Sequence, residues 1–517
     1  MMQSGPDTWF LPETLRTETL LAALAKEFSV VAAPEYAATV TYADSFDWRL
    51  YRRGYILHCH GTAWTLYHGD SGAVTVQQGG PQLHRSCFAF DFPPGSLRKV
   101  IEPLLSIRCL LPLATVSLAG RQFGLLNEDE KTVARVVFEE QRPVTVKTVY
   151  RMLRLFAVRG YDREMTRVRA LLEKNGLTTP ASPLIGFEEG CRAIDRRPLD
   201  YTSKFSLQLD SSLTSRQAMV RIYRHLLTAM QRNLPGVLDD LDSEFLHDFR
   251  VAIRRTRSGL TLVKKVLPAQ VVSSFSKDFK QLGRITGATR DLDVYLLRRE
   301  TYPARLPAAL RPGLKAFFDD LAEQRDKEVK KMVQSLRSKK TRAVLNKWRR
   351  YLASEDAEPA AEARTPVDQL AGRIIFRCFK RVMQDGGALN ADTPDADVHR
   401  LRIQCKKLRY AIEFFSTLYP GKEIQVVVRQ LKKLQDILGV FNDLSVQQEM
   451  VARTLDERRV NSHRDLEIAA ALGGLMQSLY EEQLALRHHF VEVFTRFSDP
   501  ENTALFTRLF QPQRQSS

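Results

Sequence analysis

The spacing of apolar and polar residues changes near residue 205. Before it, short runs of β-branched and aromatic residues alternate with turn signals, as in residues 39–61 and 132–153, and such runs predict β-strands. A helix in this part is expected to end at a C-terminal glycine, Gly176. After residue 205, apolar residues recur every three to four positions, which predicts long amphipathic helices. The pattern therefore predicts an α+β domain over residues 1–198 and an all-α domain over residues 205–508.

One predicted helix, around residues 247–257, has two different edges. At 3.6 residues per turn, one stripe of the helix is cationic and consists of His247, Arg250, Arg254 and Arg257. The neighbouring stripe is apolar and consists of Leu246, Phe249, Ile253 and Leu260. Like charges at these spacings repel by a few tenths of a kcal/mol per pair. An anionic partner would offset that repulsion.

The helical part contains an internal repeat with a shift of 152 residues. The shift matches His247 with His399, Arg250 with Arg402, Arg254 with Lys406, Arg255 with Lys407 and Arg257 with Arg409. It also matches Gly287 with Gly439, Asp291 with Asp443, Arg221 with Arg373 and Lys280 with Lys432. We therefore expect two pseudo-symmetric helical bundles, about residues 205–352 and 366–505, each with a cationic stripe that begins at a histidine.

The net charge of +17 is concentrated in the helical part, because residues 1–200 contribute +2 and residues 201–517 contribute +15. Such an excess favours an anionic partner there. The six cysteines are scattered without a C-x-x-C pair, which indicates a reducing compartment. No secretory signal and no apolar run of roughly 18 residues is present in the sequence. We expect a cytoplasmic protein without a membrane span.

The stripes allow two interpretations. A run of charge on a helix is commonly a solvated face, but such a face usually mixes both signs and does not repeat a histidine at one spacing. A stripe of ten residues covers about 15 Å, which suits a linear polyanion better than one compact phosphate. Arginine supplies a planar fork of donors for phosphate oxygens. We interpret His247 and His399 as hydrogen-bond donors to this ligand, with Thr393-Pro394 as the expected start of the second helix.

Residues 205–505 resemble the CHAD family, the conserved-histidine α-helical domain. The stretches that carry the resemblance are LHDFRVAIRRTRSGL and ATRDLDV in the first copy, and VHRLRIQCKKLRYAIEF and LGVFNDLSV in the second. The resemblance implies a basic groove or pore that binds inorganic polyphosphate, and association with polyphosphate granules. The binding positions it implies are His247, Arg250, Arg254, Arg255, Arg257, His399, Arg402, Lys406, Lys407 and Arg409. Lys280 and Lys432 are expected additions, and Arg221 and Arg373 complete the set of repeat-related basic positions.

The N-terminal part is similar in places to the CYTH family, the triphosphate-tunnel fold, through YADSFDWRLYRRGYILHCHG and GYDREMTRVRALLEKNGL. This resemblance implies an antiparallel β, tunnel-like domain with helices, as a degenerate tunnel or scaffold. The E-x-E-x-K strand of that family, whose carboxylates hold a divalent metal, is replaced by TWFLPETL, and the expected R-x-R pair is replaced by His58-Cys59-His60. We therefore expect a degenerate, non-catalytic domain with no cofactor.

Metal and nucleotide motifs are weak in this sequence. Of Asp291, Asp293 and Asp443, only one acid recurs at repeat-related positions, so capping or pairing with an arginine is the expected role. The histidines at 58, 60, 68 and 84 lack the spacing of a zinc site.

Two alternatives to polyphosphate binding remain open at this point. They are a metal-dependent triphosphatase or polyphosphatase, and a nucleic-acid-binding protein, for which few aromatic residues interleave the stripes.

Overall fold

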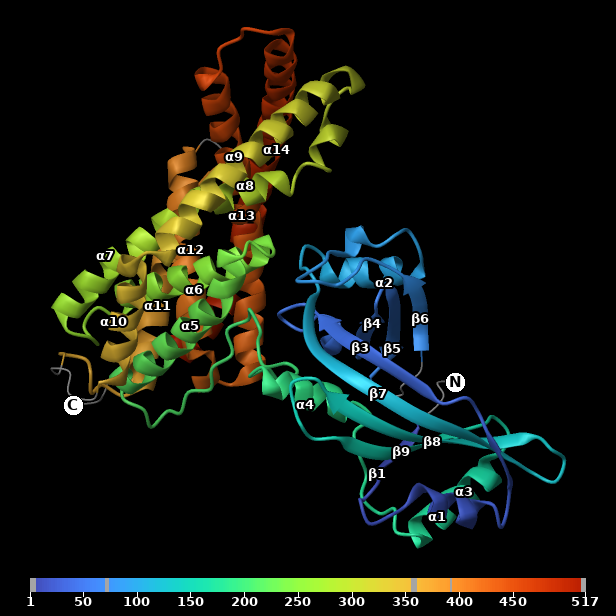
Figure 1. The fold of residues 1–517 in the computed structure, drawn as a ribbon. Helices are drawn as coiled ribbons and strands as arrows, with labels where there is room; N and C mark the ends of the chain where they lie inside the picture. The colour runs from blue at the N-terminus through green and yellow to red at the C-terminus, as the bar shows by residue number, and fades with distance from the viewer. Residues whose placement is uncertain (1–5, 70–73, 355–359, 391–392, 513–517) are drawn as a thin grey trace. The chain divides into compact units, whose positions relative to one another are not determined.

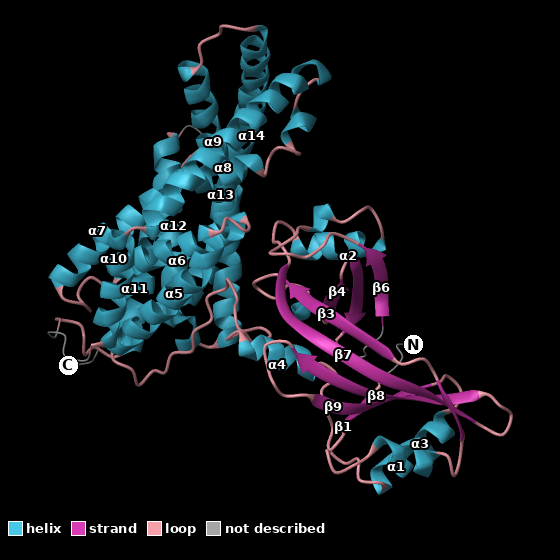
Figure 2. Ribbon diagram, viewed as in Figure 1, coloured by secondary structure: helices cyan, strands magenta, loops and turns pink. Residues whose placement is uncertain are grey.

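The computed structural model describes residues 6–69, 74–354, 360–390 and 393–512. The chain divides into two compact units, Met1–Ser203 and Lys204–Ser517 (Figure 1). The first unit combines an antiparallel sheet with helices and the second is largely helical (Figure 2). The predicted fold class, an α+β part followed by an all-α part, is confirmed.

The first unit is built on one strongly curved antiparallel sheet (Figure 2). Its strands are β1 (Asp7–Phe10), β2 (Ser29–Ala32), β3 (Tyr36–Asp44), β4 (Tyr55–His60), β5 (Ala63–His68), β6 (Val74–Gly79), β7 (Leu111–Leu126), β8 (Thr132–Pro143) and β9 (Tyr150–Ala157). The strand order is β1-β9-β8-β7-β3-β4-β5-β6, and β2 pairs with β7 where β3 no longer reaches it. Among the described residues the sheet does not close, since β1 and β6 lie at opposite ends of this order. The predicted antiparallel sheet with helices is therefore present, and in the described residues it is not closed into a barrel.

Helices cover the sheet where closure would otherwise be needed to bury its apolar side chains. They are α1 (Thr17–Leu24), α2 (Ser96–Leu105), α3 (Asp162–Lys174) and α4 (Ile185–Ala193). Leu20 and Leu24 of α1 and Val168 and Leu172 of α3 share a core with Trp9 of β1. A second core joins α2 to Trp64 and Leu66 of β5, and a third contains Phe187 of α4 and Val116 of β7. The helices thus bury three portions of the sheet, with α1 and α3 together on one of them.

The predicted stop of α3 is present. Gly176 has a φ of +98°, a left-handed conformation that glycine adopts without strain. Its N–H donates to Glu173 O at 3.0 Å, and Leu177 N donates to Leu172 O at 3.2 Å. These two bonds form a Schellman motif, which satisfies carbonyls at the end of the helix.

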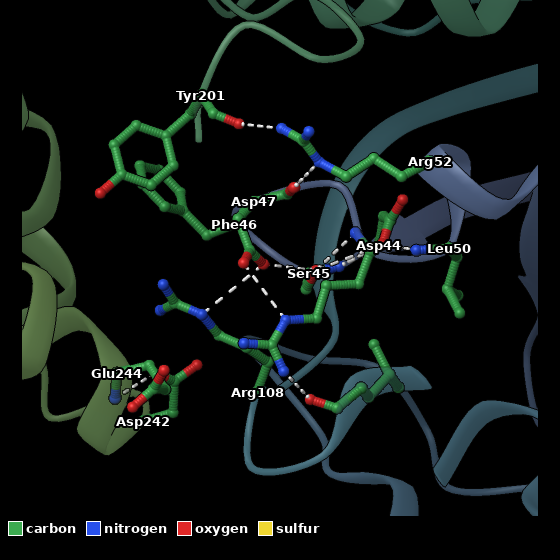
Figure 3. Close-up of polar contacts among 12 residues, drawn as sticks. Asp44, Ser45, Phe46, Asp47, Leu50, Arg52, Arg108, Tyr201, Asp242 and Glu244 are labelled. Carbon is green, nitrogen blue, oxygen red and sulfur yellow. Dashed lines mark hydrogen bonds and ion pairs between the residues drawn. The ribbon is translucent and has the colours of Figure 1, made fainter. Parts of the chain in front are cut away.

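The connection between β3 and β4 is fixed by two buried carboxylates (Figure 3). Asp44 accepts backbone N–H bonds from Ser45, Leu50 and Tyr51 at 2.6–3.0 Å. Asp47 lies 3.6 Å from Nε of the buried Arg108. These contacts give the YADSFDWRLYRRG stretch a structural role as a rigid turn.

The second unit consists of two successive sets of helices. The helices of the first copy are α5 (Ser215–Leu238), α6 (Ser243–Leu262), α7 (Ala269–Ile285), α8 (Gly287–Leu296), α9 (Arg311–Arg337) and α10 (Lys339–Ala353). Those of the second copy are α11 (Val367–Gly387), α12 (Asp395–Phe415), α13 (Gly421–Glu457), α14 (His463–Phe497) and α15 (Pro500–Phe510). The starts of α11, α12, α13 and α14 fall 152 residues after those of α5, α6, α7 and α9. The repeat read from the sequence is therefore a repeat of structure.

The two copies differ clearly at the end of α7. In the first copy the chain breaks at Thr286 between α7 and α8, whereas α13 runs without a break through the corresponding position.

The expected start of α12 is shifted by one residue, because the helix begins at Asp395 and Pro394 takes the cap position. In the part of the chain that the structure describes, none of the helices is long and apolar enough to cross a bilayer.

Candidate anion-binding site

The two cationic stripes lie on α6 and α12, which contact each other. The helix α6 starts at a side-chain cap, because Asp242 Oδ1 accepts from Glu244 N at 2.9 Å (Figure 3). Asp242 Oδ1 also accepts from Phe245 N at 3.2 Å. Its apolar edge is buried, with Phe249, Ile253 and Leu260 at most 1% exposed. Leu401 and Ile412 anchor α12 in the same way. Buried apolar edges fix the direction in which both stripes project.

The stripes converge on a pocket of about 250 Å³. Its basic lining is His247, Arg254, Arg255, Arg402, Lys406 and Arg409. The remaining lining is Val251, Cys405, Tyr410, Gln435, Asp436, Leu438 and Gly439, the last four from α13. Six of the fourteen predicted site residues therefore share one cavity, and they come from both copies of the repeat.

Several pocket cations are partly removed from water, and this lowers the pKa of some of them. Burial, with the neighbouring Arg402 and Arg254, lowers the pKa of Lys406 to about 8. Burial also lowers the pKa of Arg402, against the opposing effect of Asp443. Removal from water and nearby like charges both destabilise the charged form of these side chains when no ligand is bound. An anion in the pocket would reverse this effect.

Three arginines of the stripes have donors that nothing in the structure satisfies. The Nε atoms of Arg250, Arg254 and Arg402 are buried and lack a hydrogen-bond partner in the described part of the chain. Leaving a buried donor unpaired costs roughly 1–3 kcal/mol. Two of these arginines, Arg254 and Arg402, line the pocket. Two arginines with unpaired N–H groups that line a cationic cavity favour an acceptor-rich ligand.

One carboxylate connects the stripes. Glu413 Oε2 accepts from Nη2 and Nε of Arg255 at 2.8 and 3.1 Å, and Glu413 Oε1 accepts from Arg409 Nε at 2.6 Å. Arg255 belongs to the first copy, and Arg409 and Glu413 belong to the second. This contact fixes the positions of two pocket arginines and neutralises part of their charge.

The repeat-related histidines are held at the same ring nitrogen. His247 Nδ1 lies 2.8 Å from Arg290 Nη2, and His399 Nδ1 lies 2.8 Å from Asn442 Oδ1. His247 lines the pocket, whereas His399 is exposed and does not.

Part of the helical unit matches a known family of domains. The CHAD domain model matches residues 221–452. Residues 221–452 form a CHAD domain. The crystal structure of the CHAD domain from the plant Ricinus communis is similar, with 25% identity, a TM-score of 0.48, and coverage of 60% of this chain and 98% of that one. PptA from Streptomyces chartreusis is also similar, with 19% identity, a TM-score of 0.45, and coverage of 55% of this chain and 100% of that one. A search of curated proteins finds no significant match.

The resemblance of the helical part to the CHAD family is thus confirmed over the matched residues. The family model does not extend into the first unit. The CYTH resemblance of that unit stays a prediction.

Eight predicted residues of the CHAD domain do not line the pocket. Arg250 donates through Nη1 to Gly283 O and Thr286 Oγ1, both at 2.9 Å, and so stabilises the break between α7 and α8. Lys407 is half-buried outside the lining. The other six are exposed: Arg221, Arg257, Lys280, Arg373, His399 and Lys432. Because these six residues do not line the pocket, they can contact only a ligand that extends beyond it.

The aspartates make the pairings expected of structural residues. Asp293 Oδ1 accepts from Arg325 Nε at 2.8 Å, and Asp443 lies 3.9 Å from Arg402. In the first unit, His58 is packed between Tyr42 and Tyr67, and His60 Nδ1 contacts Thr39 O at 2.8 Å. Within the described residues no cluster of three potential metal ligands is found.

Sequence reasoning missed the residues that hold the site together. Glu413 could have been found as an acid four positions after Arg409, on the same helical face. Arg290 and Asn442 are themselves related by the 152-residue shift. Gln435 gave no signal, because its repeat partner is Gly283.

Proposed function

We propose that the CHAD domain binds inorganic polyphosphate, and that a segment of the polyphosphate lies in the pocket between α6 and α12. The unpaired, buried Nε atoms of Arg254 and Arg402 carry this proposal. Phosphate oxygens are acceptors only, so they satisfy these donors and compensate the buried charge.

The arrangement of the cations favours a linear ligand. Lining residues span 247–255 on α6 and 402–410 on α12, about 12 Å of each helix. Exposed cations such as Arg257 continue the stripe beyond the pocket. A chain of phosphates can follow this line and contact both copies of the repeat.

Nucleic acid is the less favoured ligand. Tyr410 is the one tyrosine, phenylalanine or tryptophan in the described lining, and a single ring offers no run of stacking platforms for bases. In a competition titration at physiological salt, we expect long-chain polyphosphate to displace RNA and not the reverse. Preferential binding of RNA would contradict the proposal.

We further propose that the protein acts by binding and not by catalysis, and that it associates with polyphosphate granules in the cytoplasm. In the first unit, Trp9 and Leu11 are buried in the strand region where the CYTH resemblance would require charges. The alternative is a metal-dependent triphosphatase or polyphosphatase activity, which an assay of phosphate release with Mg²⁺ or Mn²⁺ tests directly.

A further inference from the structure

The two repeat-related histidines are held by different chemistry. Arg290 lies 43 residues after His247, and Asn442 lies 43 residues after His399. Both partners contact Nδ1 at 2.8 Å. The geometry is repeated, but a guanidinium takes the place of an amide oxygen.

The partner fixes where the proton of each neutral ring lies. A guanidinium has donors and no acceptor, so Nδ1 of His247 has to accept from Arg290. A neutral His247 therefore carries its hydrogen on Nε2. The oxygen of Asn442 can only accept, so Nδ1 of His399 carries the hydrogen, and Nε2 of a neutral His399 has a lone pair.

We propose that Arg290 and Asn442 are positioning residues that hold His247 and His399 in opposite tautomers, so that the two half-sites recognise phosphate differently. His247 donates from Nε2 while its ring is neutral. His399 donates to a phosphate oxygen only as an imidazolium, because its single neutral hydrogen is used by Asn442. The assignment of tautomers stands without a ligand, and the difference in phosphate recognition rests on the proposed function.

Other charged groups surround His399 and enter its environment. Asp395 and Arg402 lie one helical turn to either side on α12, and Asp443 follows Asn442 on α13. Arg487 of α14 pairs with Asp395. His247 has Glu244 and Arg250 one turn to either side on α6, Asp248 beside it, and Arg290 with Asp291 on α8.

The tautomers can be read from ring ¹³C and ¹⁵N shifts of labelled histidine in the sedimented full-length protein. Spectra are recorded by magic-angle spinning at a pH high enough for neutral rings, without ligand. His247→Gln and His399→Gln each remove one signal and so assign the two rings among the ten histidines. We expect the Nε2–H tautomer for His247 and the Nδ1–H tautomer for His399. The same tautomer at both rings would overturn the proposal.

Exchange of the partners is the sharper test. Asn442→Arg is expected to convert His399 to the Nε2–H tautomer, whereas the conservative Asn442→Asp retains Nδ1–H. Arg290→Asn is expected to convert His247 to Nδ1–H. Circular dichroism checks that each variant folds. Because Arg290 also donates to Ser243 O, that variant alone risks misfolding, and the exposed His399 keeps the test decisive. If His399 keeps the Nδ1–H tautomer in the Asn442→Arg variant, Asn442 does not have the positioning role.

Addition of long-chain polyphosphate separates the two layers of the proposal. We expect His399 to show two protonated ring nitrogens in the bound state and His247 to show one. Unchanged histidine spectra in the presence of bound polyphosphate would contradict different recognition by the half-sites. Absence of any binding would contradict the proposed function and leave the ligand-free tautomers as measured.

Discussion

Nη2 of Arg255 lies 2.8 Å from Oε2 of Glu413, and this contact joins the two copies of the repeat at the candidate site. The side chains of Arg255 and Glu413 are 10% and 18% exposed. The pair is therefore mostly buried.

Loss of one partner from this pair is expected to destabilise the helical unit. Glu413→Ala leaves Arg255 buried and unpaired, which costs about 3 kcal/mol, the lower end of the range for a broken buried pair. Replacing both partners with apolar residues, Arg255→Met with Glu413→Leu, is expected to cost much less. Urea unfolding followed by circular dichroism measures both. The control is Glu423→Ala, which breaks a pair with the exposed Arg508 and should change stability by less than about 1 kcal/mol. Equal effects of Glu413→Ala and Glu423→Ala would contradict a buried bridge.

Affinity for polyphosphate is expected to fall as pH rises through about 8. Burial and the charges of Arg402 and Arg254 lower the pKa of Lys406 to about 8 in the free protein. A bound polyanion stabilises the charged form, so above pH 8 binding has to take up a proton at Lys406. Titrations between pH 7 and pH 9.5 test this, with Lys406→Arg as the control that stays charged. A variant that loses affinity with pH as steeply as the wild type would show that another group is responsible.

The effect of pH on the stability of the free protein has the opposite sign to its effect on affinity. The pKa of Lys406 is lower in the folded protein than in the unfolded chain, where it lies near 10.4. Between these values the unfolded state binds more protons, so this lysine makes the free protein more stable as pH rises above about 8.

The repeat and the identity of the helical domain could be predicted because they are properties of the chain alone. A shift of 152 residues aligns the histidines in the sequence, and the same shift aligns the starts of α6 and α12 in the structure. Which cations share a cavity depends on how α6, α12 and α13 pack, and no local pattern contains that. Arg254 and Arg257 lie on the same stripe of a helical wheel, yet only Arg254 lines the pocket. Strand patterns likewise do not show whether the edge strands β1 and β6 pair, so closure of the sheet in the first unit could not be predicted from the sequence.

Salt is expected to weaken binding log-linearly, because polyanion binding releases condensed counterions. By analogy with DNA, 6–10 phosphate contacts would reduce affinity by about 10³–10⁵ between 50 and 200 mM salt. Arg254→Gln should reduce the slope of log affinity against log salt by about one, since one contact is lost. Arg257→Gln, exposed beyond the pocket on the same helix, should reduce the slope only for chains long enough to extend past the pocket. A flat response would instead indicate a small, enclosed ligand.

No release of phosphate from triphosphate or polyphosphate is expected with Mg²⁺ or Mn²⁺. Glu13 and Glu18, the carboxylates that follow Trp9 and Leu11 in the altered stretch and the next helix, are exposed, and Glu18 pairs with Arg121 at 3.4 Å. Exposed carboxylates on one edge do not form a metal-binding strand. Turnover that disappears in Glu13→Gln with Glu18→Gln would show that the first unit is catalytic.

The central claim is that the pocket between α6 and α12 binds polyphosphate, and calorimetric titration of two matched double variants tests it most directly. Arg254→Gln with Lys406→Gln removes two charges from the pocket. Lys280→Gln with Lys432→Gln removes two charges from exposed, repeat-related positions outside it. Each charge-assisted contact contributes roughly 1.5–3 kcal/mol, so the pocket variant should lose at least about 100-fold in affinity for long-chain polyphosphate. The surface variant should lose only a few-fold. If both variants remain folded and the surface pair weakens binding as much as the pocket pair, polyphosphate binds to the general positive surface and not to this site.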